Sequence, residues 1–120
     1  MDSTLDLLQR AALRLSQEGS IKDRLADAYA SHLLEIDADD LPEEVRDDFA
    51  AMCEAMHRER PLPRESVIRA SVRKMSNEET ERHAASIVRM FCRLTRQQEL
   101  ELPMPATSGA AVVQLFAAEG

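Results

Sequence analysis

The sequence predicts an all-α protein, a compact bundle of about five helices with a short fourth helix, followed by an apolar C-terminal tail. Two observations predict this class. Aromatic residues make up only 3% of the 120 residues and Gly occurs three times, while Ala, Leu, Arg and Glu, which lose little conformational freedom in a helix, dominate. In addition, serines followed three positions later by an acidic residue precede segments whose apolar residues recur at helical spacing.

The first helix is expected to begin after Ser3, because Asp6 stands three positions further on, as a capping box requires. Gly19 ends it, since glycine adopts a left-handed backbone at low cost. Apolar residues at helical spacing predict one buried face: Leu5, Leu8, Ala11, Ala12 and Leu15.

Ser20 and Asp23 repeat the capping pattern and start a second helix. Only Gly19 and Ser20 then separate the first two helices, and so short a connection favours a tight corner or an antiparallel hairpin. The expected buried stripe consists of Ile21, Leu25, Ala28, Tyr29, His32 and Ile36.

The acidic stretch 35–44 interrupts the pattern, and a third helix is expected to begin near Pro42, because proline suits the first turn of a helix. A calcium-binding loop starting at Asp37 does not fit, since Leu41 has no ligating side chain and Pro42 stands where glycine is needed. We interpret the stretch as a solvated connection. The expected buried face of the third helix is Val45, Phe49, Met52, Cys53 and Met56.

A fourth, shorter helix is predicted from about Arg64 to Met75, with Ile68 and Val72 also facing inward. Ser76 and Glu79 then form a further capping box, and the fifth and longest helix is expected to reach about residue 98. Its predicted stripe is Thr80, Ala84, Ile87, Val88, Phe91 and Leu94. Phe49 and Phe91 are expected to anchor the core from two different helices.

The sequence thus predicts a helical domain over residues 1–98 and a proline-containing tail over residues 99–120. Pro103 and Pro105 prevent the fifth helix from continuing. The tail carries four large apolar residues that are candidates for binding a partner: Val112, Val113, Leu115 and Phe116.

Charge is divided unevenly along the chain. Residues 1–57 contain fourteen acidic and five basic side chains, whereas residues 58–96 contain ten basic and five acidic ones, within a net charge of −7. This asymmetry predicts two electrostatic faces, one of which recognises a partner. The further candidate partner-binding residues are basic side chains expected on the fourth and fifth helices: Arg64, Arg69, Arg73, Lys74, Arg89 and Arg93.

The same basic helices support an alternative, because neutralised phosphates provide most of the affinity for DNA or RNA. Two helices joined near Ser76 resemble a helix-turn-helix in outline. Against this alternative, the sequence pI is about 4.9. Acidic side chains also open the fifth helix, where a recognition helix would meet bases and phosphates: Glu78, Glu79 and Glu81.

Cys53 and His57 are four residues apart, a spacing that can bind zinc. A structural site needs two further ligands, and His83 and Cys92, nine residues apart on one helix, would point to nearly opposite sides. His32 is the other candidate. We therefore expect no metal and no cofactor, and we interpret the cysteines as free thiols. His32 and Tyr29 share the stripe of the second helix and form a candidate polar core pair.

The sequence contains no glycine-rich phosphate loop, no nucleophile elbow and no metalloprotease-type helix. It also has no apolar run long enough for a transmembrane helix and no signal-peptide pattern. We therefore predict a cytoplasmic protein of bacterial type without catalytic activity. The expected function is regulation or adaptation by contact of its helix surfaces with another protein or with a second copy of itself, and DNA or RNA binding by residues 64–96 is the alternative.

Overall fold

In the computed structural model, which describes residues 2–101, five α-helices and two short helical turns account for 75% of those residues, and no strand occurs among them. The α-helices are α1 (Thr4–Leu15), α2 (Ile21–Ala28), α3 (Glu43–Met56), α4 (Val67–Lys74) and α5 (Asn77–Glu101). A π-helical turn (Tyr29–Leu33) continues α2, and a 3-10 turn (Ala38–Asp40) precedes α3. The predicted all-α class is confirmed. The four apolar tail candidates, Val112, Val113, Leu115 and Phe116, lie outside the described residues.

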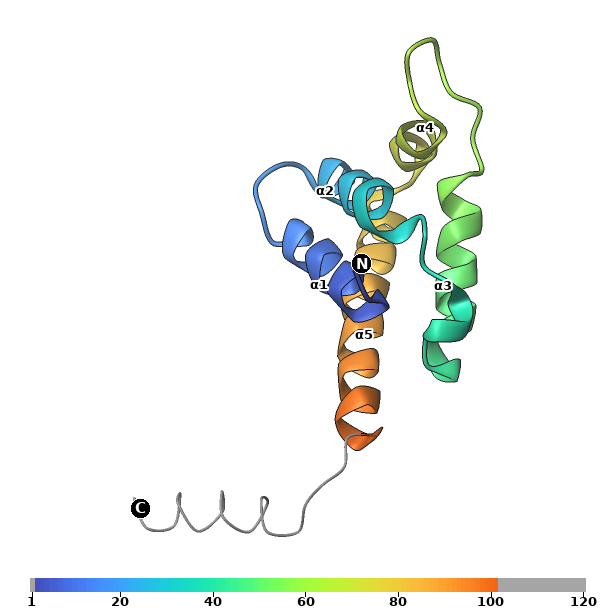
Figure 1. Cartoon of the computed structure of the whole chain (residues 1–120). Coiled ribbons are helices and arrows are strands. Elements are labelled where there is room, and N and C mark those ends of the chain that lie inside the picture. The colour runs from blue at the N-terminus through green and yellow to red at the C-terminus, as the bar shows by residue number, and fades with distance from the viewer. Residues whose placement is uncertain (1, 102–120) are drawn as a thin grey trace, which may run out of the picture.

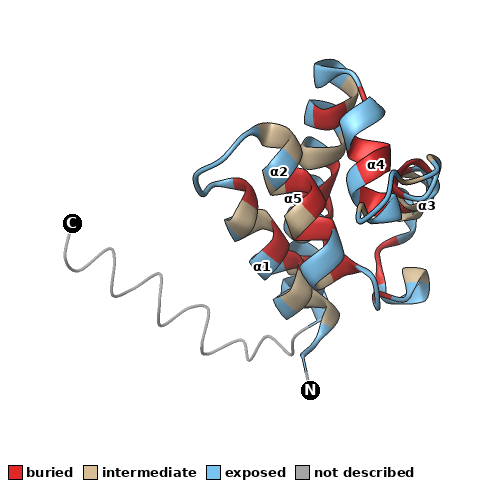
Figure 2. Cartoon of the chain, turned by 90° about the horizontal axis from the view of Figure 1, so that it is seen from above, coloured by how far each residue is buried: buried red, intermediate tan, exposed pale blue. Residues whose placement is uncertain are grey.

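Helix α5 organises the bundle. It packs against α1, α2 and α3, while the short α4 packs against α2 and α3 (Figure 1). The buried faces of the helices meet in a single core, and their exposed faces point outward (Figure 2). Burial of apolar side chains from every helix is the main favourable contribution to such a fold. The large side chains with the least exposure include Leu8, Leu25, Leu33, Met52, Met56, Ile87 and Met90.

Helix α1 begins as predicted. The Ser3 hydroxyl accepts from the Asp6 N–H at 3.1 Å, and the Ser3 N–H donates to the Asp6 carboxylate at 3.4 Å. The helix ends at Leu15 rather than at Gly19, so the connection to α2 is longer than the two residues expected. The apolar pattern stops at Leu15, and the Ser16 hydroxyl donates to the Leu13 carbonyl, which completes the end of the helix. Gly19 has the expected left-handed backbone, with φ of +114°.

Two arginines hold this connection in place. Arg14 donates to the Glu18 carbonyl at 3.1 Å and forms an ion pair with Asp27 of α2 at 2.7 Å. Arg24 donates to the Gly19 carbonyl at 3.0 Å and also to the Leu15 carbonyl. These guanidinium groups satisfy the Leu15 carbonyl at the end of α1 and two carbonyls of the connection. Positive charge near the end of α1 is also favoured by the helix dipole.

The second helix differs from its prediction after Ala28. Ser20 caps it as expected, because its hydroxyl accepts from the Asp23 N–H at 3.1 Å. Its last turn is π-helical, which places more residues in each turn than an α-helix does. His32 is consequently turned away from the buried stripe on which Tyr29 and Leu33 lie, and it is only partly buried.

Helix α4 begins at Val67 rather than near Arg64, because Ser66 is its cap and accepts from the Arg69 N–H at 3.0 Å. Helix α5 begins after Ser76, whose hydroxyl accepts from the Glu79 N–H at 3.0 Å as predicted. It continues to Glu101, three residues beyond the expected end.

The buried face of α5 is rotated slightly from the expected stripe. Thr80, Ile87 and Leu94 are buried as predicted, but Val88 is 43% exposed and Met90 is completely buried. Phe91 packs against the core but is only partly buried, so it anchors the core less than expected. Phe49 is 6% exposed and fulfils the same expectation on α3.

Candidate interaction surface

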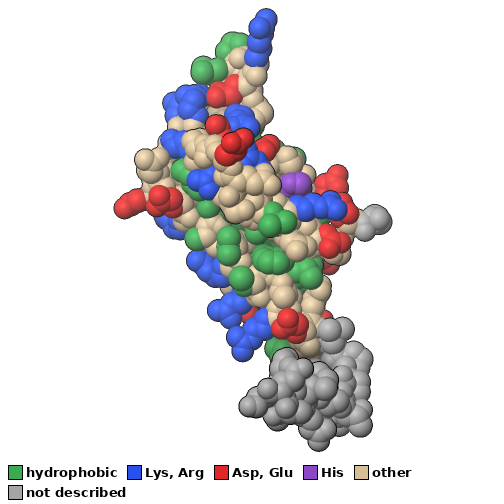
Figure 3. All heavy atoms as spheres, turned by 90° about the vertical axis from the view of Figure 1, so that its left-hand side faces the viewer, with side chains coloured by type: hydrophobic (Ala, Val, Ile, Leu, Met, Phe, Trp, Pro, Cys, Tyr) green, Lys and Arg blue, Asp and Glu red, His purple; other side chains and the backbone are tan. Residues whose placement is uncertain are grey.

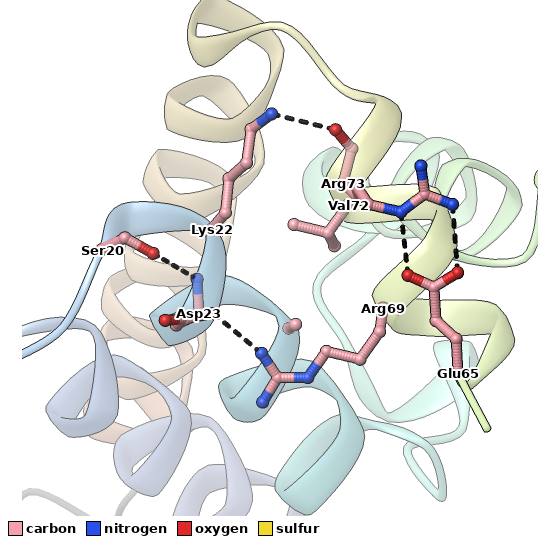
Figure 4. Close-up of a pocket in the computed structure, with 8 residues that line it drawn as sticks. Ser20, Lys22, Asp23, Glu65, Arg69, Val72 and Arg73 are labelled. Carbon is pink, nitrogen blue, oxygen red and sulfur yellow. Dashed lines mark hydrogen bonds and ion pairs between the residues drawn. The ribbon is translucent and has the colours of Figure 1, made fainter. Parts of the chain in front are cut away.

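The main hollow that involves the predicted basic residues lies between α2 and α4. This α2–α4 groove has a volume of about 370 Å³, and Figure 4 shows charged side chains from both sides of it reaching toward one another. Two buried apolar residues, Ala26 and Val72, line the groove together with the side chains drawn around them. The remaining lining residues are Ser20, Lys22, Asp23, Glu65, Arg69 and Arg73.

The cations of the groove are engaged by neighbouring groups. Arg69 of α4 pairs with Asp23 of α2, with Nη1 and Oδ1 3.1 Å apart. Lys22 donates to the Arg73 carbonyl at 3.1 Å, which satisfies a backbone acceptor near the end of α4. The groove therefore presents alternating positive and negative charge beside a small apolar surface.

Glu65 is the most strongly held of these acidic groups. Its carboxylate accepts two hydrogen bonds from Arg73, at 2.9 and 3.0 Å, and a third from the Leu62 N–H at 3.0 Å. The hydrogen bonds from Arg73, followed by that from the Leu62 N–H, lower the pKa of Glu65 to about 2. Glu65 is therefore ionised across the neutral and mildly acidic range and links α4 to the loop before it.

The other predicted basic candidates lie outside this groove. Arg89 of α5 pairs with Asp48 of α3 at 2.8 Å. Arg93 borders a second hollow, of about 240 Å³, where the C-terminal part of α5 lies near Glu44 at the start of α3. Lys74 is exposed at the end of α4, and Arg64 is exposed in the loop that precedes it. In Figure 3 basic side chains extend along one side of the molecule, but acidic and hydrophobic side chains lie between them.

The candidate pair of Tyr29 and His32 is not brought together. The Tyr29 hydroxyl instead lies 3.2 Å from Nε2 of His57 on α3. Burial, and secondarily the neighbouring Cys53, raise the pKa of Tyr29 well above its ordinary value. His32 lies elsewhere, in a hollow that it shares with Asp2 and Arg10 near the start of α1.

Cys53 and His57 do not belong to a larger set of potential ligands. Within residues 2–101 no three His, Cys, Asp or Glu side chains converge as a metal site would require. Cys53 is half-buried and Cys92 is exposed, and both are free thiols. That the protein binds no metal stays a prediction.

One polar cluster joins the loop after α3 to the start of α5, and its contact with Arg58 could not be anticipated from sequence spacing. Arg58 forms two hydrogen bonds with Glu79, at 3.1 and 3.3 Å, and Glu79 lies 3.7 Å from Nε2 of His83. This nitrogen is buried and has no hydrogen-bond partner among the described residues. Burial lowers the pKa of His83, although the nearby Glu79 opposes the shift. His83 therefore favours the neutral form in the folded protein.

No protein-family model, no curated protein and no solved structure matches this chain. None of the helices in the described part of the chain combines the length and the apolar character needed to cross a lipid bilayer.

Proposed function

We propose that this protein is a small, non-catalytic cytoplasmic regulator or adaptor that binds another protein through the surface around the α2–α4 groove. The observation that carries the proposal is the alternation of charge on that surface. Arg69 and Arg73 are each paired with a carboxylate, and the apolar Val72 lies between them along the helix. Apolar area surrounded by polar groups is the usual composition of a protein–protein interface.

Pre-existing ion pairs favour this function over nucleic-acid binding. A phosphate backbone attracts unpaired cations, and each intramolecular carboxylate reduces the local positive potential. Three of the predicted basic residues have such a carboxylate partner: Arg69, Arg73 and Arg89.

DNA or RNA binding remains the second candidate because of the C-terminal half of α5. Arg93 and Arg96 form no ion pair with another described residue, and both are exposed beside the hollow near Glu44. If these residues bind phosphates, the affinity for duplex DNA or RNA falls steeply with added salt. Substituting both with Gln then reduces the salt dependence, whereas Arg69→Gln leaves it unchanged.

The proposed function can be tested with two matched charge reversals. Arg69→Glu and Arg89→Glu each disrupt one exposed ion pair between helices, so their effects on stability are expected to be small and similar. The tagged protein is used to isolate partners from nuclease-treated extract, and the affinity of each purified partner is then measured directly, including self-association of the chain. Arg69→Glu is expected to weaken binding about tenfold or more, since arginine is enriched among residues that dominate interface energies.

Arg89→Glu provides the control, because it lies on the α3–α5 side rather than in the α2–α4 groove. A partner that loses affinity equally with both variants, or only with Arg89→Glu, contradicts the proposed surface. Failure of the wild-type protein to bind any protein, combined with salt-sensitive binding of nucleic acid, would favour the second candidate.

A further inference from the structure

The loop between α3 and α4, residues 57–66, extends from one end of the bundle (Figure 1). Its tip, residues 60–64, contains Pro61 and Pro63 on either side of Leu62. Proline fixes its own φ angle and biases the preceding residue toward an extended backbone. The tip therefore has few conformations available even before its contacts with the rest of the protein are considered.

Several hydrogen bonds restrict this loop further. The Glu59 N–H donates to the hydroxyl of the buried Ser71 on α4 at 3.0 Å. Leu62 is bonded through both of its backbone groups, because its N–H donates to the Glu65 carboxylate and its carbonyl accepts from the Glu65 N–H, each at 3.0 Å. Arg73 holds the same carboxylate, so the loop is connected directly to α4.

The backbone at Arg64 is unusual. Its φ of +68° is the one positive φ of a non-glycine residue within the described part of the chain. With Pro63 before it and the hydrogen bond between Leu62 and Glu65 around it, Arg64 occupies the position of a type II turn that normally carries glycine. Such strain persists only where the surroundings enforce it, and it is concentrated at functional positions.

The side chains at the tip are nevertheless presented to solvent. Leu62 is 58% exposed although its backbone is fully hydrogen-bonded. Arg60 and Arg64 are exposed on either side of it, and neither forms an ion pair with another described residue. Figure 3 shows a basic side chain beside hydrophobic ones at the top of the molecule, at the height where Figure 1 places this loop.

We propose that the tip, residues 60–64, is a preformed recognition element that places Leu62 in an apolar pocket of a partner protein, with Arg60 and Arg64 pairing with carboxylates at the rim of that pocket. This inference rests on the proposed function and names the chemistry of the partner. A rigid loop loses little conformational entropy on binding, so the order built into the tip favours affinity directly. Arginine at residue 64 in place of glycine keeps the turn and adds a second cation beside Leu62.

The composition of the tip favours a protein partner over a membrane or a nucleic acid. Stable binding to a lipid surface needs a larger apolar face than one leucine between two prolines. Binding to single-stranded nucleic acid normally uses aromatic side chains that stack on bases, and residues 60–64 include none. An exposed leucine with unpaired arginines on both sides instead complements an apolar pocket with an acidic rim.

The experiment uses a phage-displayed library of random peptides, selected on the full-length protein. We expect enriched peptides in which an aromatic or aliphatic residue lies next to Asp or Glu. The affinity of a synthetic copy is then measured for each variant. Leu62→Ser and the double substitution of Arg60 and Arg64 by Gln are each expected to weaken binding about tenfold or more.

Two further variants separate recognition from folding. Leu13→Ser is the matched control, because Leu13 is 55% exposed on α1, away from the loop, and its substitution should leave peptide affinity unchanged. Arg64→Gly relieves the positive φ but removes a cation. It is expected to keep or raise the unfolding midpoint while weakening peptide binding, and Arg64→Lys is expected to retain binding.

Selected peptides that bind Leu62→Ser as well as the wild type would overturn the inference. If those peptides are instead lost with Arg69→Glu, the proposed function stands and only the role of the loop is wrong. A library from which the wild-type protein enriches nothing also overturns the inference, whereas the proposed function is decided by the partner affinities of Arg69→Glu and Arg89→Glu. Binding to phosphatidylserine vesicles or to oligonucleotides that depends on Leu62 would overturn the choice of a protein partner.

Discussion

Replacing Phe49 and Phe91 separately by Ala tests how the core is organised, because the two rings differ in burial although both come from helices of the same bundle. Phe49 is 6% exposed on α3, whereas Phe91 is only partly buried against the edge of the core. Removal of a fully buried phenylalanine ring costs about 3–5 kcal/mol, through lost transfer free energy and the cavity that remains. The cost at Phe91 should be smaller, about 1–3 kcal/mol, since its ring already contacts water in the folded protein.

These values are large against the total stability of about 5–15 kcal/mol that is usual for a single domain. For a domain of this size, each kcal/mol lowers the thermal midpoint by about 4–8 °C. Phe49→Ala is therefore expected to lower it by at least about 12 °C, and Phe91→Ala by clearly less. Urea and thermal unfolding followed by far-UV circular dichroism measure both effects. Equal losses at the two positions, or a loss below about 1 kcal/mol at Phe49, would refute the placement of α3 and α5 against the core.

Four further predictions follow from named residues. Burial lowers the pKa of His83 below its value in the unfolded chain, so its contribution to stability is present above about pH 6.5 and is lost as the pH falls through the lowered pKa. Between about pH 7.5 and 5.5, the urea midpoint of His83→Gln should therefore decline less than that of the wild-type protein. Asp37→Ala should cost about 1 kcal/mol because the carboxylate caps the 3-10 turn at 2.9 Å, whereas the exposed Asp39→Asn should change stability by less than about 0.5 kcal/mol in the same assay. Elemental analysis of untagged protein should find no stoichiometric metal, and one zinc per chain that is lost with Cys53→Ser would contradict this expectation. Deletion of residues 103–120 should leave helicity and the unfolding midpoint nearly intact but weaken self-association or partner binding, as measured by light scattering; a large loss of monomer stability would show that the tail belongs to the core.

The helices were predictable because each signal is local. Ser3, Ser20 and Ser76 begin helices through hydrogen bonds to residues three positions away, and sequence alone contains that spacing. The spacing of apolar residues likewise identified most of the buried face of α3. Interactions between a serine or an apolar stripe and its own helix do not depend on how the helices are arranged, so the fold class could be inferred without that knowledge.

The predictions that the structure contradicts concern features that depend on tertiary packing. On α5 both Val88 and Met90 are apolar, and only the positions of α1, α2 and α3 around that helix decide that Met90 is buried and Val88 is exposed. The π-helical turn after α2 also turns His32 away from Tyr29, and no local sequence signal predicts such a turn. The partners of Tyr29 and Arg69 come from segments distant in sequence. Charge and spacing could therefore identify these two residues as candidates but could not predict their contacts.

In the loop tip, too, local signals predict part of the conformation and contacts between distant residues determine the rest. Pro61 and Pro63 disfavour a helix at this point of the sequence, and proline at the second position of a turn is a familiar local signal. The positive φ of Arg64 could not be predicted, since glycine or asparagine is expected there. What holds it is the Glu65 carboxylate, which joins the Leu62 N–H to Arg73 in the last turn of α4. Glu65→Gln should therefore loosen the tip selectively, because the neutral amide weakens the charge-assisted bonds to Arg73 while the helices keep their packing. The expected result is faster amide exchange at Leu62 and at residue 65 than in the wild-type protein, without a change in the core of α5. Exchange rates in the loop equal to those of the wild type would show that the prolines alone fix its conformation.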